Sequence, residues 1–275
     1  MSKPAADAAN PHELLALAAS LAREAGVMVR AGRARGIVET DTKSSSTDMV
    51  TEFDRASEQL IVGRILDARP NDGLIGEEGA STPGTSGVTW LIDPIDGTTN
   101  FLYGLPGYAV SIAAASAEGT LAGAVYIPAT DELFTATRGG GAFLDGTPIH
   151  CSTTTNLAQA LVGTGFSYLA QRRVAQGRRV AAILPLVRDI RRLGAAAPDL
   201  CYVAAGRIDA YFEQNLGPWD LAAGALIATE AGCHLGGYDG SPVTPAEVLA
   251  ANPALFPAMV QLLADTNPGA EPGIM

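Results

Sequence analysis

Apolar residues recur at helical spacing in two long stretches near the start of the chain. Over residues 12–32, an apolar set recurs near helical spacing (Leu14, Leu15, Leu17, Leu21 and Val27), which predicts an amphipathic helix. The stretch 46–70, STDMVTEFDRASEQLIVGRILDARP, has the same period and predicts a second long helix. Thr47 or Asp48 is placed to cap its start, and Pro70 follows its end.

A series of short segments with strand character follows these helices. Residues 72–79 (DGLIGEEG) predict a strand that runs into a turn. Residues 88–92 (VTWLI) predict a strand buried on both faces, because nearly every position is apolar. Further strands are predicted at 108–116, 120–128, 133–139 and 141–146, and the short turns between them favour an antiparallel meander.

The second half of the chain mixes helical and strand patterns. Strands are predicted at 160–167 and 208–214, helices at 170–193 and 219–233, and a helix or a strand at 199–206. Residues 244–265 are expected to close the fold. The pattern predicts a layered α/β protein, with an α+β subdomain over 1–150, an α/β subdomain over 151–268 and a flexible tail over 269–275.

Composition and charge narrow the class of protein. The chain has 275 residues, of which 47% are hydrophobic and 17% charged, so a large core is expected and global disorder is not. The net charge of −11 argues against nucleic-acid binding, which requires clustered Lys and Arg. The main basic cluster is interpreted as a solvated helix face rather than as an anion or partner site. It comprises Arg172, Arg173, Arg178, Arg179, Arg188, Arg191 and Arg192.

The cysteines and histidines give no sign of a disulfide framework or a zinc site. Cys151, Cys201 and Cys233 are far apart, and the three histidines lack ligand spacing. Buried free thiols in a reducing cytosol are therefore expected. The first residues contain no apolar leader core, and no run of about eighteen apolar residues occurs. We expect a soluble, cytoplasmic protein without a membrane partner.

Carboxylates gather at the predicted ends of strands and starts of helices. They are Asp48 and Asp54 in the second helix, Glu77 and Glu78 after a strand, Asp93 and Asp96 after the next strand, Glu213 at a strand end and Asp220 at a helix start. Strand ends that face helix starts are where α/β folds collect their sites. Several carboxylates persist together only when a proton or a cation neutralises them. An all-oxygen set without His or Cys favours Mg²⁺.

The segment GTTNF, residues 97–101, supplies a complementary feature. Gly97 allows a close turn, Thr98 or Thr99 can cap a short helix, and backbone N–H groups at such a turn point toward an anion. Metal-binding carboxylates beside an N–H cradle describe a site for hydrolysis of a phosphate ester, with a metal-bound water as the nucleophile. Thr98, with its hydroxyl near Asp48, is expected to orient and deprotonate that water.

Single members of the carboxylate set also have purely structural interpretations. Asp93 and Asp96 taken alone can simply end a strand and cap a helix. Asp54 is interpreted as a helix cap or ion-pair partner, and Glu78 as a neighbour of Glu77 that points away. The ordered set as a whole, rather than any one pair, favours a metal site.

Four motifs together resemble those of the inositol monophosphatases, which belong to a wider group of Mg²⁺-dependent, lithium-sensitive phosphatases. They are DMVTEFD (48–54), GEEG (76–79), WLIDPIDGTTNF (90–101) and WDLAAGALIATEAG (219–232), and the stretch 192–213 also matches. The resemblance covers about residues 12–265. It implies the layered α-β-α-β-α sandwich of the sugar phosphatases and assembly as a homodimer.

The resemblance also implies which residues hold metal. Glu77, Asp93 and the carbonyl of Ile95 would hold one Mg²⁺ ion. Asp93, Asp96 and Asp220 would hold a second, and Glu77 would help to place a third. The implied cofactor is therefore Mg²⁺, with two or three ions bound.

Catalytic and substrate-binding residues are implied in the same way. The catalytic residues would be Thr98, Asp48 and Glu77, with the Thr98 hydroxyl bonded to Asp48. The N–H groups of Gly97 and Thr98 would bind the phosphate. Substrate hydroxyls would meet Asp96, Glu213, Asp220 and the backbone of Gly194, Ala195 and Ala196. At Ala195 the family often has Ser or Thr, which puts the substrate in doubt more than the reaction.

The predicted function is Mg²⁺-dependent hydrolysis of a small polyol phosphate, with inositol 1-phosphate as the first choice. Histidinol phosphate, a nucleotide 3′-phosphate and fructose 1,6-bisphosphate are open alternatives, because specificity lies in loops around residues 160–220. A regulatory or binding module on the same fold is an alternative of another class. The mutually repulsive acidic set argues against that alternative, since a module has no physical need for it.

Overall fold

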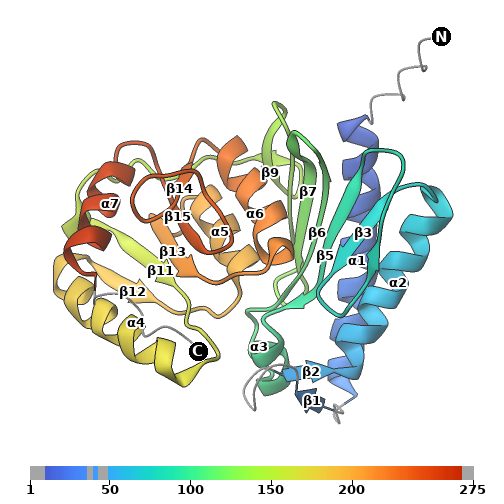
Figure 1. The fold of residues 1–275 in the computed structure, drawn as a ribbon, viewed down its shortest axis with the longest axis horizontal. Helices are drawn as coiled ribbons and strands as arrows, with labels where there is room; N and C mark the ends of the chain where they lie inside the picture. Colours follow the sequence, from blue (N-terminus) through green and yellow to red (C-terminus); the bar gives the residue numbers. More distant parts are fainter. Residues whose placement is uncertain (1–9, 36–39, 43–48, 268–275) are drawn as a thin grey trace.

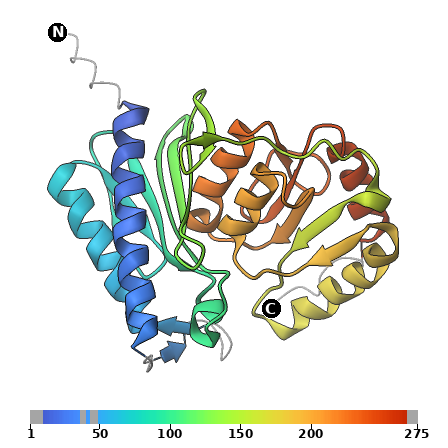
Figure 2. The same cartoon turned by 180° about the vertical axis from the view of Figure 1, so that it is seen from behind.

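The computed structural model describes residues 10–35, 40–42 and 49–267, in which helices and sheets alternate in layers (Figures 1 and 2). The layers are α1 (Pro11–Ala34) with α2 (Glu52–Ala68), a first sheet, α5 (Ala196–Ala204) with α6 (Pro218–Glu230), a second sheet, and α4 (Ala170–Ile183) with α7 (Phe256–Asp265). The predicted α-β-α-β-α sandwich is confirmed. Asp48 and the predicted tail over 269–275 lie outside the described residues. No helix in the described part of the chain is long and apolar enough to cross a bilayer.

Helix α2 starts later than its sequence pattern predicts. Its N-cap is Thr51, and the prediction of Thr47 or Asp48 as the cap is wrong. The chain is still extended at this point, because β2 (Met49–Thr51) pairs antiparallel with β1 (Thr40–Thr42). The backbone N–H of Thr51 donates to Oδ2 of Asp54 at 2.8 Å, which completes a capping box.

The first sheet is an antiparallel meander with two further strands at one edge. Within the described residues its order is β10-β9-β8-β7-β6-β5-β3-β4, and β3 runs parallel to β5. The strands are β3 (Gly73–Gly76), β4 (Ser81–Thr82), β5 (Thr89–Asp96), β6 (Ala109–Ser116), β7 (Gly119–Ile127), β8 (Glu132–Thr137), β9 (Gly141–Leu144) and β10 (Thr147–Pro148). The predicted meander is confirmed, and β4 is a further short strand between the segments predicted at 72–79 and 88–92.

Side chains alternate between the two faces of this sheet. On β6, Val110 and Ile112 belong to the core beneath α1 and α2, whereas Ala113 belongs to the core beneath α5 and α6. The face of this sheet that packs against α5 and α6 carries small residues, and α6 lies close to it. A Cβ atom added at Gly123 would lie 3.0 Å from the Cα atom of Ala223. The abundance of Ala and Gly therefore reflects tight packing between the sheet and the inner helices.

The second sheet gathers three parallel strand ends at one edge. Among the described strands its order is β12-β11-β13-β15-β14, and β11 runs parallel to both β12 and β13. These strands are β11 (Leu161–Thr164), β12 (Asp189–Arg191), β13 (Ala210–Gln214), β14 (His234–Gly236) and β15 (Glu247–Ala251), and a short 3₁₀ turn, η1 (Leu157–Gln159), precedes β11. The loops that leave β11, β12 and β13 therefore emerge together.

The single helix predicted over 170–193 is wrong in its second half. Helix α4 ends at Ile183, a 3₁₀ turn η2 (Leu184–Leu186) follows, and β12 begins at Asp189. Pro185 cannot donate a helical hydrogen bond, and the chain beyond it pairs with β11 instead. The segment 199–206, predicted as helix or strand, belongs mainly to helix α5.

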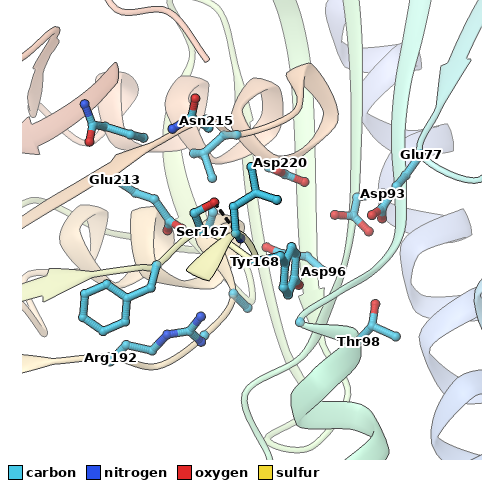
Figure 3. Close-up of a pocket in the computed structure, with 18 of the residues that line it drawn as sticks. Glu77, Asp93, Asp96, Thr98, Ser167, Tyr168, Arg192, Glu213, Asn215 and Asp220 are labelled. Atoms are coloured by element: carbon cyan, nitrogen blue, oxygen red, sulfur yellow. Dashed lines mark hydrogen bonds between the residues drawn. The ribbon is translucent and has the colours of Figure 1, made fainter. Parts of the chain in front are cut away.

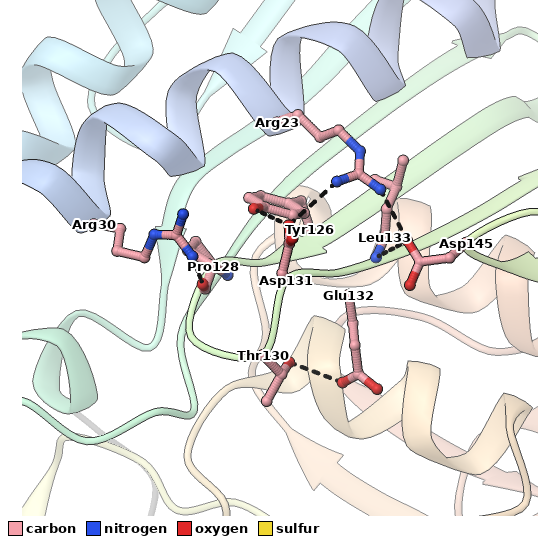
Figure 4. A network of polar contacts seen from close by, with 9 residues as sticks. All are labelled: Arg23, Arg30, Tyr126, Pro128, Thr130, Asp131, Glu132, Leu133 and Asp145. Carbon is pink, nitrogen blue, oxygen red and sulfur yellow. Dashed lines mark hydrogen bonds and ion pairs between the residues drawn. The ribbon is translucent and has the colours of Figure 1, made fainter.

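Ion pairs attach α1 to the turns at the end of the meander (Figure 4). Arg23 lies 3.3 Å from Asp131 and 2.8 Å from Asp145, and the Tyr126 hydroxyl donates to Asp131 at 2.7 Å. Both aspartates are exposed, so each ion pair contributes little to stability. These contacts orient the helix, while the buried core beneath it supplies most of the attachment.

Candidate active site

A pocket of about 390 Å³ opens where β5 ends, between the two sheets (Figure 3). One wall is formed by the end of β5 and the start of α3 (Thr98–Tyr103), and the other by the loops after β11, β12 and β13 and by the start of α6. The charged residues that line it are Glu77, Asp93, Asp96, Glu213, Asp220, Arg172 and Arg192. Carboxylates outnumber guanidinium groups, so the pocket favours cations.

Asp93 and Asp96 reach this pocket together because β5 is irregular between them. In a regular strand, residues three apart point to opposite faces of the sheet. Asp93 pairs with Ser111 and Asp96 with Ala109, so β5 holds one residue more than β6 between these pairs. This β-bulge contains Pro94, which has no N–H to donate. The bulge turns both aspartates toward the pocket.

A hydrogen bond from a backbone N–H group orients each of the three pocket aspartates, Asp93, Asp96 and Asp220. Oδ1 of Asp93 accepts from the N–H of Ile95 at 3.0 Å, and Oδ2 of Asp220 accepts from the N–H of Gly217 at 2.7 Å. Oδ2 of Asp96 accepts from the N–H of Ala197 at 2.6 Å, in the first turn of α5. The carboxylates are thus held in place before any ligand arrives.

Burial makes the ionised forms of these aspartates costly. Burial raises the pKa of Asp93 well above its ordinary value, and the charges of Glu77, Asp96 and Asp220 raise it further. Burial likewise raises the pKa of Asp96, together with the charge of Asp220 and against the hydrogen bond from Ala197. A cation between these groups would remove both penalties.

The donor chemistry fits a hard cation. The carboxylate oxygens and the carbonyl of Ile95 are oxygen ligands, with no Cys or His among the pocket residues. Among the described residues, no three acidic, His or Cys side chains converge closely enough to hold an ion as they stand. Like charges repel, so small side-chain rotations toward a bound cation are expected.

Gly97 separates the acidic strand end from helix α3. It has a φ of 87°, in the left-handed region that favours glycine. A Cβ atom here would lie 2.8 Å from the carbonyl oxygen of Gly107 and 3.0 Å from Cβ of Ala195. The backbone therefore passes so close to Gly107 and Ala195 that a side chain does not fit at this position.

The Thr98 hydroxyl connects the pocket to the start of α2. It lies 3.1 Å from Oδ1 of Asp54 and 3.1 Å from the carbonyl oxygen of Ile95, so its one proton can be donated to either. Asp54 is fully buried, and its other oxygen accepts from Thr51. Thr98 thus lines the pocket, and its hydroxyl can donate a hydrogen bond to the buried carboxylate of Asp54.

Comparison with known proteins shows which family the chain belongs to. The model of the inositol monophosphatase family matches residues 10–266. The chain belongs to the inositol monophosphatase family. It is accordingly a phosphoric monoester hydrolase of a metal-dependent family that acts on small phosphorylated compounds.

Relatives of this inositol monophosphatase family member share most of its length. The inositol-1-monophosphatase of Mycobacterium leprae is 42% identical over 94% of this chain and 96% of its own. The Nus factor SuhB of Escherichia coli is 39% identical over 92% of this chain and 97% of its own. The crystal structure of the extragenic suppressor protein SuhB from Bartonella henselae has a TM-score of 0.87 and 34% identity, over 91% of this chain and 98% of that one.

Most residues predicted as an inositol monophosphatase site lie around the pocket described above. The pocket-lining members of that set are Glu77, Asp93, Ile95, Asp96, Gly97, Thr98, Gly194, Ala195, Ala196, Glu213 and Asp220. Asp48, predicted as the partner of Thr98, lies outside the described residues. The acceptor that the structure places at the Thr98 hydroxyl is Asp54. Glu78 is not among the residues that line the pocket.

Several pocket residues were missed from the sequence. Arg172 and Arg192 were interpreted as part of a solvated helix face, yet both line the pocket, and Arg192 follows β12 rather than lying on a helix. Phe166 and Tyr168, from the loop after β11, were not singled out. The one available signal was position, since these residues follow strands whose ends meet at one edge.

Proposed function

We propose that this protein is a Mg²⁺-dependent phosphomonoesterase that hydrolyses inositol 1-phosphate to inositol and phosphate. The observation that carries the proposal is that Gly97 and Thr98 share one pocket with five carboxylates, four of which (Glu77, Asp93, Asp96 and Asp220) form the predicted metal set. The name of the Mycobacterium leprae relative, an inositol-1-monophosphatase, supports the choice of substrate. Assembly as a cytoplasmic homodimer is part of the proposal, and sedimentation of the purified protein tests the dimer.

The four carboxylates have distinct roles in this proposal. Glu77, Asp93 and the carbonyl of Ile95 would hold one Mg²⁺ ion, and Asp93, Asp96 and Asp220 would hold a second. Glu77 would also help to place a third ion. When bound, the ions supply an acidified water as the nucleophile and neutralise charge on the phosphate.

Thr98 and Asp54 accept the proton that the attacking water loses. The Thr98 hydroxyl donates to Asp54, which leaves its oxygen lone pairs directed to the pocket as an acceptor. The hydroxyl therefore orients the water, and Asp54 takes up the displaced proton. The N–H groups of Gly97 and Thr98 hold the phosphate oxygens in this arrangement.

The opposite wall binds the alcohol that leaves. Glu213 and Asp220 accept hydrogen bonds from substrate hydroxyls, as do backbone groups over residues 194–196. Ala195 offers no side-chain hydroxyl, so the inositol ring depends here on main-chain contacts. Specificity therefore rests chiefly on the loops after β12 and β13.

Phosphate release with and without Mg²⁺ tests the proposal. Wild type should release phosphate from inositol 1-phosphate only with Mg²⁺, and Asp93→Asn should lose about 100-fold or more, because one ligand of both ions is weakened. Glu78→Gln is the matched control, since Glu78 neighbours Glu77 but does not line the pocket. Undiminished Mg²⁺-dependent release by Asp93→Asn would refute the metal roles.

Calorimetric titration separates the enzyme from a binding module. Wild type should bind Mg²⁺ at millimolar concentrations or below. A protein that neither binds Mg²⁺ nor releases phosphate would instead favour a regulatory module. The Escherichia coli relative carries the name of a Nus factor, which makes that outcome worth distinguishing.

A further inference from the structure

Asn100 connects the two walls of the pocket, although its own side chain does not line the pocket. It is a buried residue of α3, and its side-chain nitrogen Nδ2 donates to the carbonyl oxygen of Leu193 at 2.8 Å and to that of Gly107. Leu193 lies 93 positions later in the chain, after β12, on the wall formed by the second sheet. The side chain of Asn100 therefore joins the short helix that follows Gly97 to the opposite wall.

The two carbonyl groups fix the orientation of this amide. An asparagine amide has two N–H donors on one nitrogen, and both are used here. The flipped orientation would place Oδ1 of Asn100 against two carbonyl oxygens, which repel it. The fit is also close, because a Cβ atom added at Gly107 or at Gly194 would lie 3.0 or 3.1 Å from Nδ2. The amide therefore has little freedom to move between these two backbone segments.

The backbone over residues 194–196 lines the pocket and is the segment proposed above to bind substrate hydroxyls. Hydrogen bonds from the first wall hold the chain on both sides of this segment. Asn100 donates to Leu193 just before it, and Oδ2 of Asp96 accepts from the N–H of Ala197 just after it, at 2.6 Å. Because Asp96 is a proposed metal ligand, the bond from Asn100 is the one that does not involve a cation site.

Helix α3 is also held in place by contacts that do not involve Asn100. Arg33 of α1 donates to the carbonyl oxygens of Phe101 and Leu102, at 2.9 and 3.2 Å. At the start of the helix, the Thr98 hydroxyl lies 3.1 Å from Oδ1 of Asp54. Loss of the contact between the walls would therefore move the segment that binds the substrate hydroxyls more than it moves the phosphate cradle.

We propose that Asn100 is a positioning residue that sets the distance between the phosphate cradle and the backbone over residues 194–196. The proposal rests on the phosphatase activity proposed above and adds how the substrate alcohol is aligned with the reacting phosphate. Asn100 itself contacts neither of them. Such alignment matters because a displacement of about 1 Å can cost roughly 100-fold in rate. The competing explanation is that Asn100 only stabilises the fold.

Asn100→Leu tests the proposal, because leucine has a similar size but no N–H donor in its side chain. The two measured quantities are kcat/KM for inositol 1-phosphate and the inhibition constant Ki for inorganic phosphate. Inorganic phosphate binds at the cradle and the cation sites but does not reach the segment that binds the alcohol. Asn100→Leu should lower kcat/KM about 10-fold or more, because the alcohol is misaligned. The Ki for inorganic phosphate should stay near its wild-type value.

Asn252→Leu is the matched control. Asn252 is a second buried asparagine, its Nδ2 donates to the carbonyl oxygen of Thr154 at 2.7 Å, and it does not line the pocket. Both variants should lower the midpoint of urea unfolding, but Asn252→Leu should leave kcat/KM unchanged. The proposal is overturned by equal losses of kcat/KM in the two variants, by an unchanged kcat/KM in Asn100→Leu, or by a Ki for phosphate that rises in parallel with KM.

Failure of the phosphatase proposal looks different, because wild type then does not hydrolyse inositol 1-phosphate at all. Calorimetric Kd values for inositol 1-phosphate and for inorganic phosphate then replace the kinetic constants. Loss of affinity for the ester alone in Asn100→Leu supports the positioning role, whereas loss of both affinities, or of neither, overturns it. A wild-type protein that binds neither ligand overturns both proposals.

Discussion

The hydroxyl of Thr98 lies 3.1 Å from Oδ1 of Asp54, a residue 44 positions earlier in the chain. Asp54 contacts two helices. Its Oδ1 accepts from Thr98 at the start of α3, and its Oδ2 accepts from the backbone N–H of Thr51 and closes the capping box of α2. The start of α2 is thereby fixed relative to the start of α3. The proposed acceptor for the proton of the attacking water, Asp54, is therefore fixed by the packing of two helices.

We expect Thr98→Ala and Asp54→Asn each to lower kcat by about 100-fold to 10,000-fold, the usual range for loss of a proton-transfer group. In Thr98→Ala the attacking water loses its hydrogen-bond partner, and in Asp54→Asn the hydroxyl loses a charged acceptor. Steady-state phosphate release at saturating Mg²⁺ measures the effect. Thr98→Ser keeps the hydroxyl and should retain most of the activity.

Thr51→Ala separates the proton-transfer role of Asp54 from its role in the helix cap. This variant removes one side of the capping box and should cost about 1 kcal/mol of unfolding free energy, while kcat stays near that of wild type. Equal losses of kcat in Thr51→Ala and Asp54→Asn would show that Asp54 acts only through the cap.

Sequence patterns predicted the layers and the meander because those features depend on local periodicity. The start of α2 could not be predicted in this way. Thr47 and Asp48 have side chains suited to capping, but Met49–Thr51 pairs with β1 as strand β2, so the helix starts only after Thr51. Similarly, a basic helical pattern continues past Ile183, yet Pro185 and pairing with β11 replace the helix by β12.

The acidic side of the site was predictable because charge at strand ends is unusual. The partner of Thr98 was harder to choose, since Asp48 and Asp54 lie in one motif and the choice depends on a contact across 44 positions. The place of Arg192 in the pocket was not predictable, because Arg191 and Arg192 look alike in the sequence. Only the path of the chain after β12 places one of them in the pocket.

The protonation of Glu213 should control substrate affinity near neutral pH. Burial raises the pKa of Glu213 to about 7; the Tyr211 hydrogen bond and the charge of Arg192 lower it, and the charge of Asp220 raises it. The ionised form is the better acceptor for a substrate hydroxyl. KM should therefore rise as the pH falls through the pKa of Glu213. In Tyr211→Phe this rise should begin at a higher pH, because a group that lowers the pKa is removed.

The comparison uses KM for inositol 1-phosphate against pH, with both proteins at one Mg²⁺ concentration, since bound cations beside Asp220 also lower this pKa. Glu213→Gln removes the titrating group and serves as the control, so its KM should lose this pH dependence. A Tyr211→Phe profile that coincides with wild type, or moves toward acid, would contradict the assignment.

Asp72 should be a major contributor to stability. Its side chain accepts from the indole N–H of the fully buried Trp90 at 2.9 Å and from the Ser86 hydroxyl at 2.6 Å, and it pairs with Arg69. Asp72→Ala leaves these donors without their acceptor, so we expect a loss of about 3 kcal/mol in unfolding free energy. Urea unfolding at neutral pH measures it. Asp41→Ala, which removes an exposed partner of Arg55, should cost less than about 1 kcal/mol.

The contribution of Asp72 should also depend on pH. Burial raises its pKa, but the hydrogen bonds from Arg69, Ser86 and Trp90 outweigh burial and lower the pKa below its ordinary value of 3.8. Its ionised form therefore stabilises the fold above that ordinary value, and the contribution is lost as the pH falls through the lowered pKa. The stability gap between wild type and Asp72→Ala should thus narrow in acid. A gap that widens in acid would show the opposite shift.

Cys151 should be the most reactive of the three thiols. A hydrogen bond from Cys233 lowers the pKa of Cys151 to about 7 against the opposing effect of burial, and Cys151 is only partly buried. The thiolate is the nucleophile, so alkylation by iodoacetamide should modify Cys151 first, at a rate that rises through neutral pH. Cys201 is fully buried, and burial raises the pKa of its thiol, so it should react last. Mass spectrometry of the labelled peptides measures each rate.

Cys233→Ala tests the cause of that reactivity. Without the donor, the pKa of Cys151 should return toward 9.0, its ordinary value. The thiolate fraction at pH 7 then falls steeply, but a more basic thiolate is a better nucleophile, so the net rate should fall only about fivefold. Cys201→Ala leaves this pair intact and should not change the rate. Faster labelling of Cys151 in Cys233→Ala would mean that Cys233 shields Cys151 rather than activates it.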